Sequence, residues 1–390
     1  MNELTRLKIG YLCDISPLDR NLYSGGNARI HDALQRHVGD VTILSNSWHA
    51  AEPVRRLVHA MPEAINLRAR WRLHLMLSRI IARGVQRELA QGQYNVLFGA
   101  YSFQSMRHIR PPCRMVKVFT ADATPTTYKR SVVGQSYGSM LSLSRYLDPL
   151  VLRAERQIFS GLDLMLWPTE WLKSGADALY DLNEAQSLVV PWGANIDAPE
   201  AETTPLPLVR GAPVRLLFIG RDWEAKGGPL VRQVVERLRN QGVDARLSVI
   251  GATPPDTDTR DHIETLGELN KSDPAQMARF ETAMRSAHFL VMPSFESFGF
   301  AFCEASAYSL PALCLRVGGV PVTDEINGHA LPLGAEPADF AEIIMRYLND
   351  PDDYAALRRS ARIEYETRLN WDSWGQRVAE ILSARVSDPG

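Results

Sequence analysis

Short apolar runs alternate along the chain with longer helix-like segments. In the first half, the runs that predict strands are Leu7–Cys13, Val41–Leu44, Asn95–Phe98, Met115–Phe119, Leu164–Trp167 and Leu188–Val190. In the second half, the runs that predict strands are Val214–Ile219, Arg246–Ile250, Phe289–Met292 and Ala312–Leu315. The helical segments that separate them include Pro229–Asn240 and Pro274–Ala287. This alternation predicts βαβ units and parallel sheets with helices on both faces. The strands are apolar throughout, as strands buried on both faces should be.

A boundary separates the two halves. The stretch Asn195–Pro213 is rich in Pro, Ala, Glu and Thr and has no strong periodicity, which predicts a linker. One doubly wound domain is expected over residues 1–195 and a second over 213–370. The length of 390 residues fits two domains. Ligands of open parallel sheets bind beyond the carboxyl ends of the strands, so two such sheets facing each other would form a deep cleft.

Composition and charge exclude several classes of protein. Lys+Arg is 43 and Asp+Glu is 45, and this balance argues against a nucleic-acid binder that works through a positive field. No apolar run approaches the roughly 18 residues of a membrane-spanning helix, and the N-terminal run is too short for a signal peptide. The cysteines form no CxxC pair, which argues against a disulfide scaffold or a structural zinc site and fits a reducing cytoplasm. They are Cys13, Cys113, Cys303 and Cys314.

A glycine-rich loop, Gly220–Gly228, follows the predicted strand 214–219 and leads into a helix. Such a turn presents backbone N–H groups to an anion. Arg221 could bind phosphate oxygens bidentately, and Lys226 adds a point charge, so the loop predicts a phosphate site. The alternative is a solvated surface turn that happens to contain Arg and Lys. The loop is not a Walker motif, because GxxxxGK[ST] is absent.

A second glycine pair, Gly25-Gly26, follows the first predicted strand and precedes the helical segment Ala28–His37. Two interpretations are open. The glycines could let the backbone approach a ligand closely. Alternatively, they form a simple turn in which Asn27 is the N-cap of the helix.

Two glutamates follow the predicted strand 289–292. Glu296 falls in the loop at the carboxyl end of the strand, and Glu304 falls in the helix after it, with seven residues between them. The N–H groups around Phe298–Phe300 would point the same way as the positive end of that helix. A carboxylate accepts hydrogen bonds from hydroxyls, so this pattern indicates a site for a sugar or a ribose.

Together these motifs resemble the retaining glycosyltransferases of family 4. Those enzymes have the GT-B fold, an α/β architecture of two Rossmann-like, doubly wound domains that face each other across a cleft. The matching motifs are Pro191–Asp197, Arg221-x4-Lys226-Gly227-Gly228, Glu296-x7-Glu304, Ala305-x5-Pro311, Gly318-Gly319-x-Pro321 and Asn370-Trp371. The resemblance is strong over 160–386 and weaker over 1–160. It implies that a C-terminal helix, 371–388, crosses back onto the first domain.

The resemblance also implies roles for residues of the second domain. Arg221 and Lys226 would hold the diphosphate, and Glu304 would bind the ribose hydroxyls. Glu296 would bind hydroxyls of the donor sugar, together with backbone N–H groups. The N–H groups are those around Phe298, Gly299 and Phe300, and the backbone that meets the nucleobase would be the segment that includes Leu266 and Leu269.

In the first domain, the resemblance places Gly25 and Gly26 against the diphosphate. Family members often carry a His-Asp pair near the donor sugar, but here Ala121 replaces the histidine and Asp122 remains, in reach of donor or acceptor. The motif Asp256-Thr257-Asp258 matches the DxD of metal-dependent glycosyltransferases of another fold. Because it follows two prolines, we interpret it as a solvated loop.

The implied reaction moves a sugar from a UDP- or GDP-sugar to an acceptor hydroxyl of a lipid, a polysaccharide or another glycoconjugate, with retention and without metal or cofactor. Bond cleavage produces an oxocarbenium-like sugar and a negative leaving phosphate, which takes the acceptor's proton. No carboxylate stands out as a nucleophile. Two alternatives are a nucleotide-sugar 2-epimerase of the same fold and a non-catalytic nucleotide-sugar-binding protein.

Segment Asn66–Ala90 is basic on one side. Its aligned arginines are Arg68, Arg72, Arg79, Arg83 and Arg87, and the apolar residues of another side are Leu67, Trp71, Leu77, Ile81, Val85 and Leu89. A basic amphipathic helix binds anionic membrane surfaces, which would place the protein in the cytoplasm at the inner face of the membrane. The alternative is an ordinary helix packed on its sheet with a solvated basic face. Trp167, Trp171 and Trp192 are interpreted first as packing residues and second as an acceptor platform.

Overall fold

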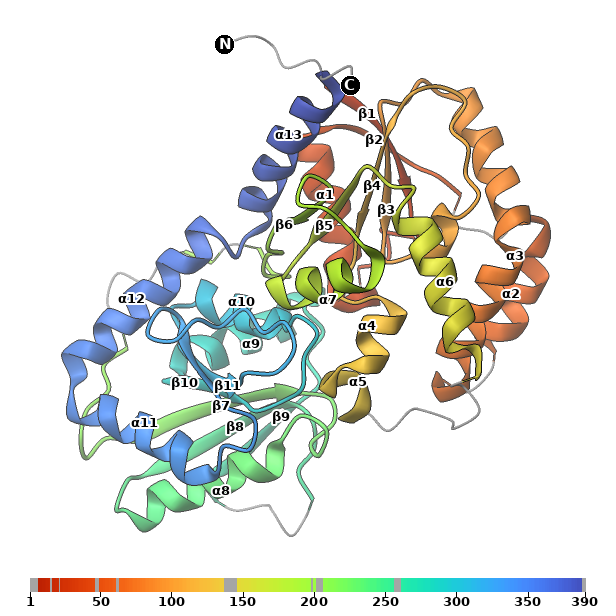
Figure 1. The fold of residues 1–390 in the computed structure, drawn as a ribbon. Coiled ribbons are helices and arrows are strands. Elements are labelled where there is room, and N and C mark those ends of the chain that lie inside the picture. Colours follow the sequence, from red (N-terminus) through yellow and green to blue (C-terminus); the bar gives the residue numbers. More distant parts are fainter. Residues whose placement is uncertain are drawn as a thin grey trace. The chain divides into compact units, whose positions relative to one another are not determined.

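The structure is a computed structural model that describes residues 6–14, 16–20, 22–45, 49–60, 63–136, 146–197, 199–200, 206–255 and 261–387. The chain separates into two compact units (Figure 1). The first unit consists of Met1–Trp192 and Trp371–Gly390, and the second of Gly193–Asn370. The chain therefore enters the second unit just before the expected linker and leaves it where the sequence predicts the C-terminal helix.

The first unit is built on a parallel sheet in the order β2-β1-β3-β4-β5-β6. Its strands are β1 (Leu7–Leu12), β2 (Gly39–Ile43), β3 (Val96–Ala100), β4 (Val116–Thr120), β5 (Leu164–Trp167) and β6 (Ser187–Val189). Its helices are α1 (Gly26–His37), α2 (Glu52–His59), α3 (Glu63–Gln91), α4 (Pro125–Arg130), α5 (Val132–Ser136), α6 (Asp148–Phe159), α7 (Glu170–Tyr180) and α13 (Trp371–Ser387). All six strands predicted for this half are therefore confirmed, with ends displaced by at most two residues.

Alternate residues of these strands pack against two helix layers, because successive side chains of a strand point to opposite faces. Leu97 and Phe119 join a buried cluster with α3, α6 and α7. On the opposite face, Phe98 stacks on Tyr11 with 6.0 Å between ring centroids, and its edge meets Trp374 of α13 at 6.3 Å. The last helix of the chain thus completes the core of the first unit beside α1 (Figure 1).

The second unit has a parallel sheet in the order β12-β11-β10-β7-β8-β9. Its strands are β7 (Val214–Gly220), β8 (Ala245–Gly251), β9 (Ile263–Gly267), β10 (Phe289–Met292), β11 (Ala312–Leu315) and β12 (Gly328–Leu331). Its helices are α8 (Gly228–Asn240), α9 (Pro274–Ser286), α10 (Phe300–Ala307), α11 (Pro337–Asn349) and α12 (Pro351–Thr367). Each unit is therefore a three-layer α/β structure of Rossmann type.

The pattern of apolar runs missed both edge strands of the second sheet. β9 has the sequence IETLG, in which Glu264 and Thr265 are exposed. β12 has the sequence GHAL and is only four residues long. A strand at the edge of a sheet needs less apolar surface than a central strand, so neither segment forms an apolar run.

Glu155 is a carboxylate buried inside the first unit. It lies on α6 and is 0% exposed. Its Oε1 accepts a hydrogen bond from the backbone N–H of Thr126 at 3.0 Å, and Oε2 is bonded to the hydroxyl of the same residue. Burial raises the pKa of Glu155 to about 7. Glu155 therefore joins α6 to the start of α4, close to the end of β4.

We expect Glu155 to make the first unit less stable as the pH rises. A carboxyl whose folded pKa is raised stabilises the fold fully below its unfolded pKa and loses that contribution as the pH passes the folded value. Thermal unfolding between pH 5 and pH 8 should therefore show the melting temperature of Glu155→Gln rising relative to wild type by a few degrees. The matched control is Glu170→Gln, an exposed carboxylate on α7, which should give a constant difference. A constant difference for Glu155→Gln as well would contradict the prediction.

Candidate functional site

The strand order of the second unit changes direction between β7 and β10. β8 and β9 lie on one side of this pair, and β11 and β12 lie on the other. In open sheets of this type, ligands bind beyond the carboxyl ends of the two strands at such a switch. The loops there are 221–227 after β7 and 293–299 after β10. These loops hold the two motifs that the sequence singled out.

The central contact of this site joins Lys226 to Glu296. The ammonium Nζ lies 2.5 Å from Glu296 Oε1, and the hydroxyl of Ser294 donates to the same oxygen at 2.6 Å. The stem of Lys226 crosses the end of β7 at Gly220, where an added Cβ would come within 2.7 Å of Lys226 Cγ. Both charged side chains keep some exposure, 24% for Lys226 and 14% for Glu296. The structure thus brings together two residues that are 70 positions apart in sequence.

The loop that carries Lys226 is folded tightly around Trp223. This tryptophan is 5% exposed, and its ring centroid lies 5.2 Å from that of Phe218. Gly228 packs against the indole so closely that a Cβ would lie 2.1 Å from it, whereas Gly227 has a φ of +81° and caps α8. The two glycines are therefore required for different reasons, one for space and one for backbone conformation.

Arg221 lies on the same loop with an exposed side chain. It makes no hydrogen bond or ion pair with any other residue that the structure describes. Helix α8 begins a few residues later and has no acidic residue in its first turn. The loop therefore carries two cationic side chains and leads into the positive end of α8. Such an arrangement attracts anions.

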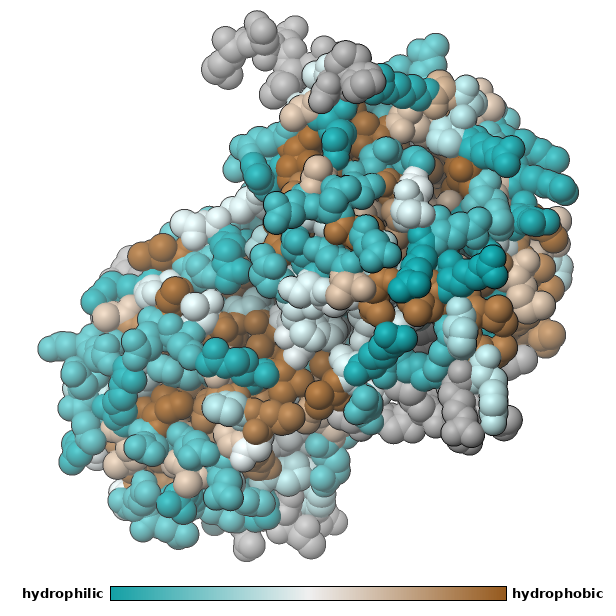
Figure 2. All heavy atoms as spheres, in the orientation of Figure 1, coloured by the Kyte–Doolittle hydropathy of each residue, from teal (hydrophilic) through white to brown (hydrophobic). Residues whose placement is uncertain are grey.

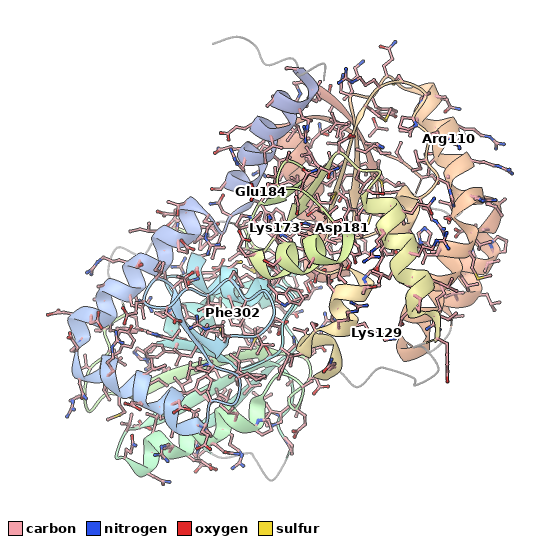
Figure 3. The ribbon with its side chains drawn as sticks, viewed as in Figure 1. Arg110, Lys129, Lys173, Asp181, Glu184 and Phe302 are labelled. Carbon is pink, nitrogen blue, oxygen red and sulfur yellow. The ribbon has the colours of Figure 1, made fainter. Side chains whose placement is uncertain are left out.

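Helix α10 begins directly after Gly299, which has a φ of +89°. A Cβ at this glycine would lie 2.6 Å from the ring of Phe302, which is labelled in Figure 3. Phe298 is 1% exposed and packs edge-on against Phe300 at 5.1 Å. The side chain of Phe298 therefore packs in the core and does not face a ligand.

The second glycine motif of this unit also lies beside Glu296. Gly318 forms a parallel β-bridge with Glu296, and the N–H of Gly319 donates to the Glu296 carbonyl at 3.2 Å. These contacts tie the loop after β10 to the segment after β11. The position of Glu296 is therefore fixed through its backbone as well as through Lys226.

Glu304 lies on α10 with a side chain that is only 3% exposed. Its carboxylate is paired with the ammonium of Lys271, which sequence reasoning missed. Lys271 belongs to the loop between β9 and α9, just after Leu269. Leu266 and Leu269 are half-buried, and the Leu266 carbonyl accepts a bond from Arg279 at 3.1 Å. Lys271 thus links the Leu266–Leu269 segment to Glu304.

The remaining predicted site residues lie in the first unit. Gly25 has a φ of +86° and is the N-cap of α1, and Gly26 is buried at the first position of that helix. The interpretation of Asn27 as the N-cap is wrong, because Asn27 lies inside α1, where its side chain accepts from the Tyr11 hydroxyl at 2.5 Å. Asp122 is half-buried, two residues beyond the end of β4. Gly25, Gly26 and Asp122 therefore lie beyond the carboxyl ends of β1 and β4.

The structure also decides between interpretations of two tryptophans. Trp167 and Trp192 are both 0% exposed. Trp167 donates to the Ser187 hydroxyl at 2.9 Å, and Trp192 donates to the Thr120 hydroxyl at 3.2 Å. Their packing role is confirmed, and an acceptor platform made by either ring is excluded. Trp171 is half-buried.

The motif Asp256-Thr257-Asp258 lies outside the described residues. Over the ranges that the structure does describe, no group of three or more His, Cys, Asp and Glu side chains could hold a metal ion.

Two parallel six-stranded sheets with helices, and a charged site at a strand-order switch, define a protein of the GT-B class. Residues 213–350 match the family model of the glycosyl transferases group 1. The match lies within the second unit, so this part of the chain is similar to the group 1 glycosyltransferases.

Curated relatives with glycosyltransferase names also match this chain. The chain is 27% identical over 255 residues to a D-inositol 3-phosphate glycosyltransferase of Corynebacterium kroppenstedtii, and 25% identical over 286 residues to D-inositol 3-phosphate glycosyltransferase 2 of Catenulispora acidiphila. These matches cover 60% and 68% of this chain, but only 55% and 66% of the two relatives. This chain thus matches little more than half of the first relative's length.

Two solved structures share the fold over almost the whole chain. The lipopolysaccharide outer core galactosyltransferase WaaB has a TM-score of 0.65 at 13% identity, covering 97% of this chain and 100% of that one. The Anabaena protein HepE, solved in complex with UDP and glucose, has a TM-score of 0.57 at 14% identity, with the same coverage.

We expect Gly228→Ala to destabilise the second unit. The added methyl would lie 2.1 Å from the buried Trp223 ring, so the loop or the indole must shift, and overpacking of this kind costs about 1–3 kcal/mol. Urea unfolding followed by tryptophan fluorescence measures the effect. The control is Gly175→Ala on α7, where the nearest atom is a Thr127 methyl at 3.6 Å. Equal unfolding midpoints for Gly228→Ala and wild type would show that the loop is not tightly packed.

Proposed function

We propose that this protein is a retaining, metal-independent glycosyltransferase that transfers a sugar from a UDP- or GDP-sugar to an acceptor hydroxyl. The observation that carries the proposal is the contact of Lys226 with Glu296 beside the exposed Arg221, at the strand-order switch. Cations next to a carboxylate suit a ligand that is anionic at one end and rich in hydroxyls at the other. A nucleotide-diphosphate sugar is such a ligand.

Arg221 and Lys226 are proposed to bind the diphosphate at the start of α8. When the bond between sugar and phosphate breaks, negative charge grows on the phosphate oxygens, and the sugar becomes oxocarbenium-like. Positive groups held in place by the Trp223 loop stabilise that charge more strongly in the transition state than in the ground state. These two side chains would supply the positive charge that a metal ion provides in other glycosyltransferases.

Glu296 is proposed to accept hydrogen bonds from hydroxyls of the donor sugar, while backbone N–H groups of Phe298, Gly299 and Phe300 bind its oxygens. Lys226 would then bind the diphosphate, and its contact with Glu296 would fix the position of the sugar relative to the phosphate. Glu304 is proposed to bind the ribose, and the backbone between Leu266 and Leu269 to contact the base.

Retention needs no nucleophile from the protein in this proposal. The leaving phosphate takes the proton of the acceptor hydroxyl on the same face of the sugar from which it departs. The first unit is proposed to bind the acceptor. Its Gly25 and Gly26 are proposed to face the diphosphate, and Asp122 to contact the donor or the acceptor. The relatives named above support a sugar-transfer reaction, and the HepE complex supports UDP as one candidate nucleotide.

We expect Lys226→Met and Arg221→Ala each to weaken nucleotide binding by about tenfold or more, because hydrogen bonds to charged groups contribute about 1.5–3 kcal/mol. Titration calorimetry with UDP and with GDP measures the effect. EDTA should leave the wild-type affinity unchanged. The control is Lys173→Met, which removes a lysine paired with Asp177 at 2.6 Å on α7 (Lys173 is labelled in Figure 3).

Wild-type protein that binds neither UDP nor GDP would overturn the proposed function. NMR of a donor sugar incubated with enzyme alone distinguishes the remaining alternatives. Slow hydrolysis with retention supports transfer, a 2-epimer supports the epimerase, and an unchanged donor that binds supports a non-catalytic protein.

A second proposal concerns helix α3 and an anionic membrane surface. Ile81, Val85 and Leu89 are buried, which confirms that this side of the helix packs on the sheet, whereas Arg79 and Arg83 are exposed. The side chains of Leu67, Arg68 and Trp71 lie outside the described residues. Arg87 is also exposed, whereas Arg72 and Leu77 are half-buried. Among the described residues, no helix is long and apolar enough to cross a membrane.

Exposed apolar side chains accompany these arginines. Met76 is 77% exposed and Ile80 is 38% exposed on α3, and Leu57 is 65% exposed on α2. Figure 2 shows hydrophobic and hydrophilic side chains interspersed over α2 and α3. We propose that this surface contacts the inner face of the membrane, where a lipid-linked acceptor would be found.

Co-sedimentation with phosphatidylglycerol vesicles at low salt tests this contact. Reversal of two charges, Arg79→Glu with Arg83→Glu, should reduce binding at least tenfold, because each basic residue near an anionic surface contributes about 1 kcal/mol. The control is Arg237→Glu with Arg359→Glu, which changes the net charge equally on exposed positions of the second unit. Wild type that stays in the supernatant would exclude the membrane contact.

A further inference from the structure

Lysine is rare in this chain, and its positions in the second unit are informative. Of the 43 Lys and Arg residues, only six are lysines. Residues 193–370 contain two of them, Lys226 and Lys271, and both pair with a glutamate of the candidate site. Lys226 pairs with Glu296, and Lys271 pairs with Glu304. Only the first of these pairs has a role in the function proposed above.

The backbone around Lys271 is held by a compact set of hydrogen bonds. The N–H of Ser272 donates to the Asn270 side-chain oxygen at 2.9 Å, and the N–H of Asn270 donates to Gln276 Oε1 at 2.8 Å. Asp273 caps α9 through the N–H groups of Ala275 and Gln276 at 2.9 and 3.0 Å. The loop therefore presents Lys271 from a fixed position.

The two partners of this pair differ in exposure. Glu304 is 3% exposed along its side chain, whereas Lys271 is 35% exposed. The ammonium also lies 4.7 Å from the centroid of the buried Phe280 ring, which holds it over α9 by a cation–π contact. An ammonium has three N–H donors, and Glu304 uses one of them. The pair therefore presents donors and carboxylate lone pairs side by side at the edge of the site.

We propose that Lys271 is a specificity-determining residue that reads a ribose hydroxyl of the nucleotide together with Glu304. This inference rests on the proposed function, in which Glu304 binds the ribose. A hydroxyl donates one hydrogen bond and accepts others. In the proposed arrangement, the ribose hydroxyl donates to Glu304 and accepts from Lys271, so both of its functions are recognised.

This arrangement discriminates against nucleotides that lack the hydroxyl. Without it, Glu304 and Lys271 would each lose a partner inside a partly desolvated site, and unpaired groups of this kind make a site selective. Lys271 also compensates the charge of the buried Glu304, so it has a structural role that the experiment must separate from recognition.

A chemical double-mutant cycle makes this separation. Calorimetry compares wild type and Lys271→Met with whichever of UDP and GDP binds wild type, and with its 2′-deoxy and 3′-deoxy forms. We expect Lys271→Met to weaken binding of the ribonucleotide about tenfold, and to change binding of one deoxy form by less than about threefold. Lys271→Arg should restore part of the affinity, and Lys173→Met should change none of the values.

An equal loss for all three nucleotides, or no loss for any, would overturn the inference and leave the proposed function standing. Binding of neither UDP nor GDP by wild type would overturn both. If Lys271→Met does not fold, Lys271→Met combined with Glu304→Gln leaves no buried charge uncompensated. We expect this double variant to bind the ribonucleotide and its deoxy forms with equal, weak affinity, and retained preference for the ribose would contradict the proposal.

Discussion

The adjacency of β7 and β10 is the constraint on which the second unit depends. The two strands pair in parallel through Leu216 and Phe289, although more than seventy residues separate them. In an open parallel sheet, ligands bind beyond the carboxyl ends of such a pair. The loops after these strands meet there, and a lysine from one contacts a glutamate from the other. Polar groups that would be unfavourable inside the sheet are thus gathered at the one edge where the topology leaves them accessible.

Much of this arrangement was predictable from the sequence, because its parts are local. The central strands are buried on both faces, so they appear as apolar runs, and Phe289–Met292 and Ala312–Leu315 were predicted with the observed bounds. The glycine loops were equally visible, since Gly227 and Gly299 occupy backbone conformations that other residues rarely adopt. Candidate site residues that directly follow a buried strand could therefore be located from the sequence, without knowledge of the fold.

The features that sequence reasoning missed depend on contacts in space. Nothing around Lys271 in the sequence indicates its partner, because Glu304 lies 33 positions away on another element. Asn27 resembles a helix cap in sequence, but the buried Tyr11 hydroxyl uses its side chain instead. Similarly, Glu155 carries no sequence signal, and its raised pKa follows from burial between α4 and α6. Each case requires knowledge of which elements become neighbours.

The return of the last helix to the first unit makes the second unit an insertion within a single chain. Its first and last residues meet, since the Ala194 N–H donates to the Leu369 carbonyl at 3.0 Å. On the other unit, Trp192 and Trp371 are also close, with 6.2 Å between ring centroids. The place where the chain enters the second unit therefore lies next to the place where it leaves. Because of this connectivity, recombination could exchange residues 193–370 between related chains without a new chain connection through the core of either unit.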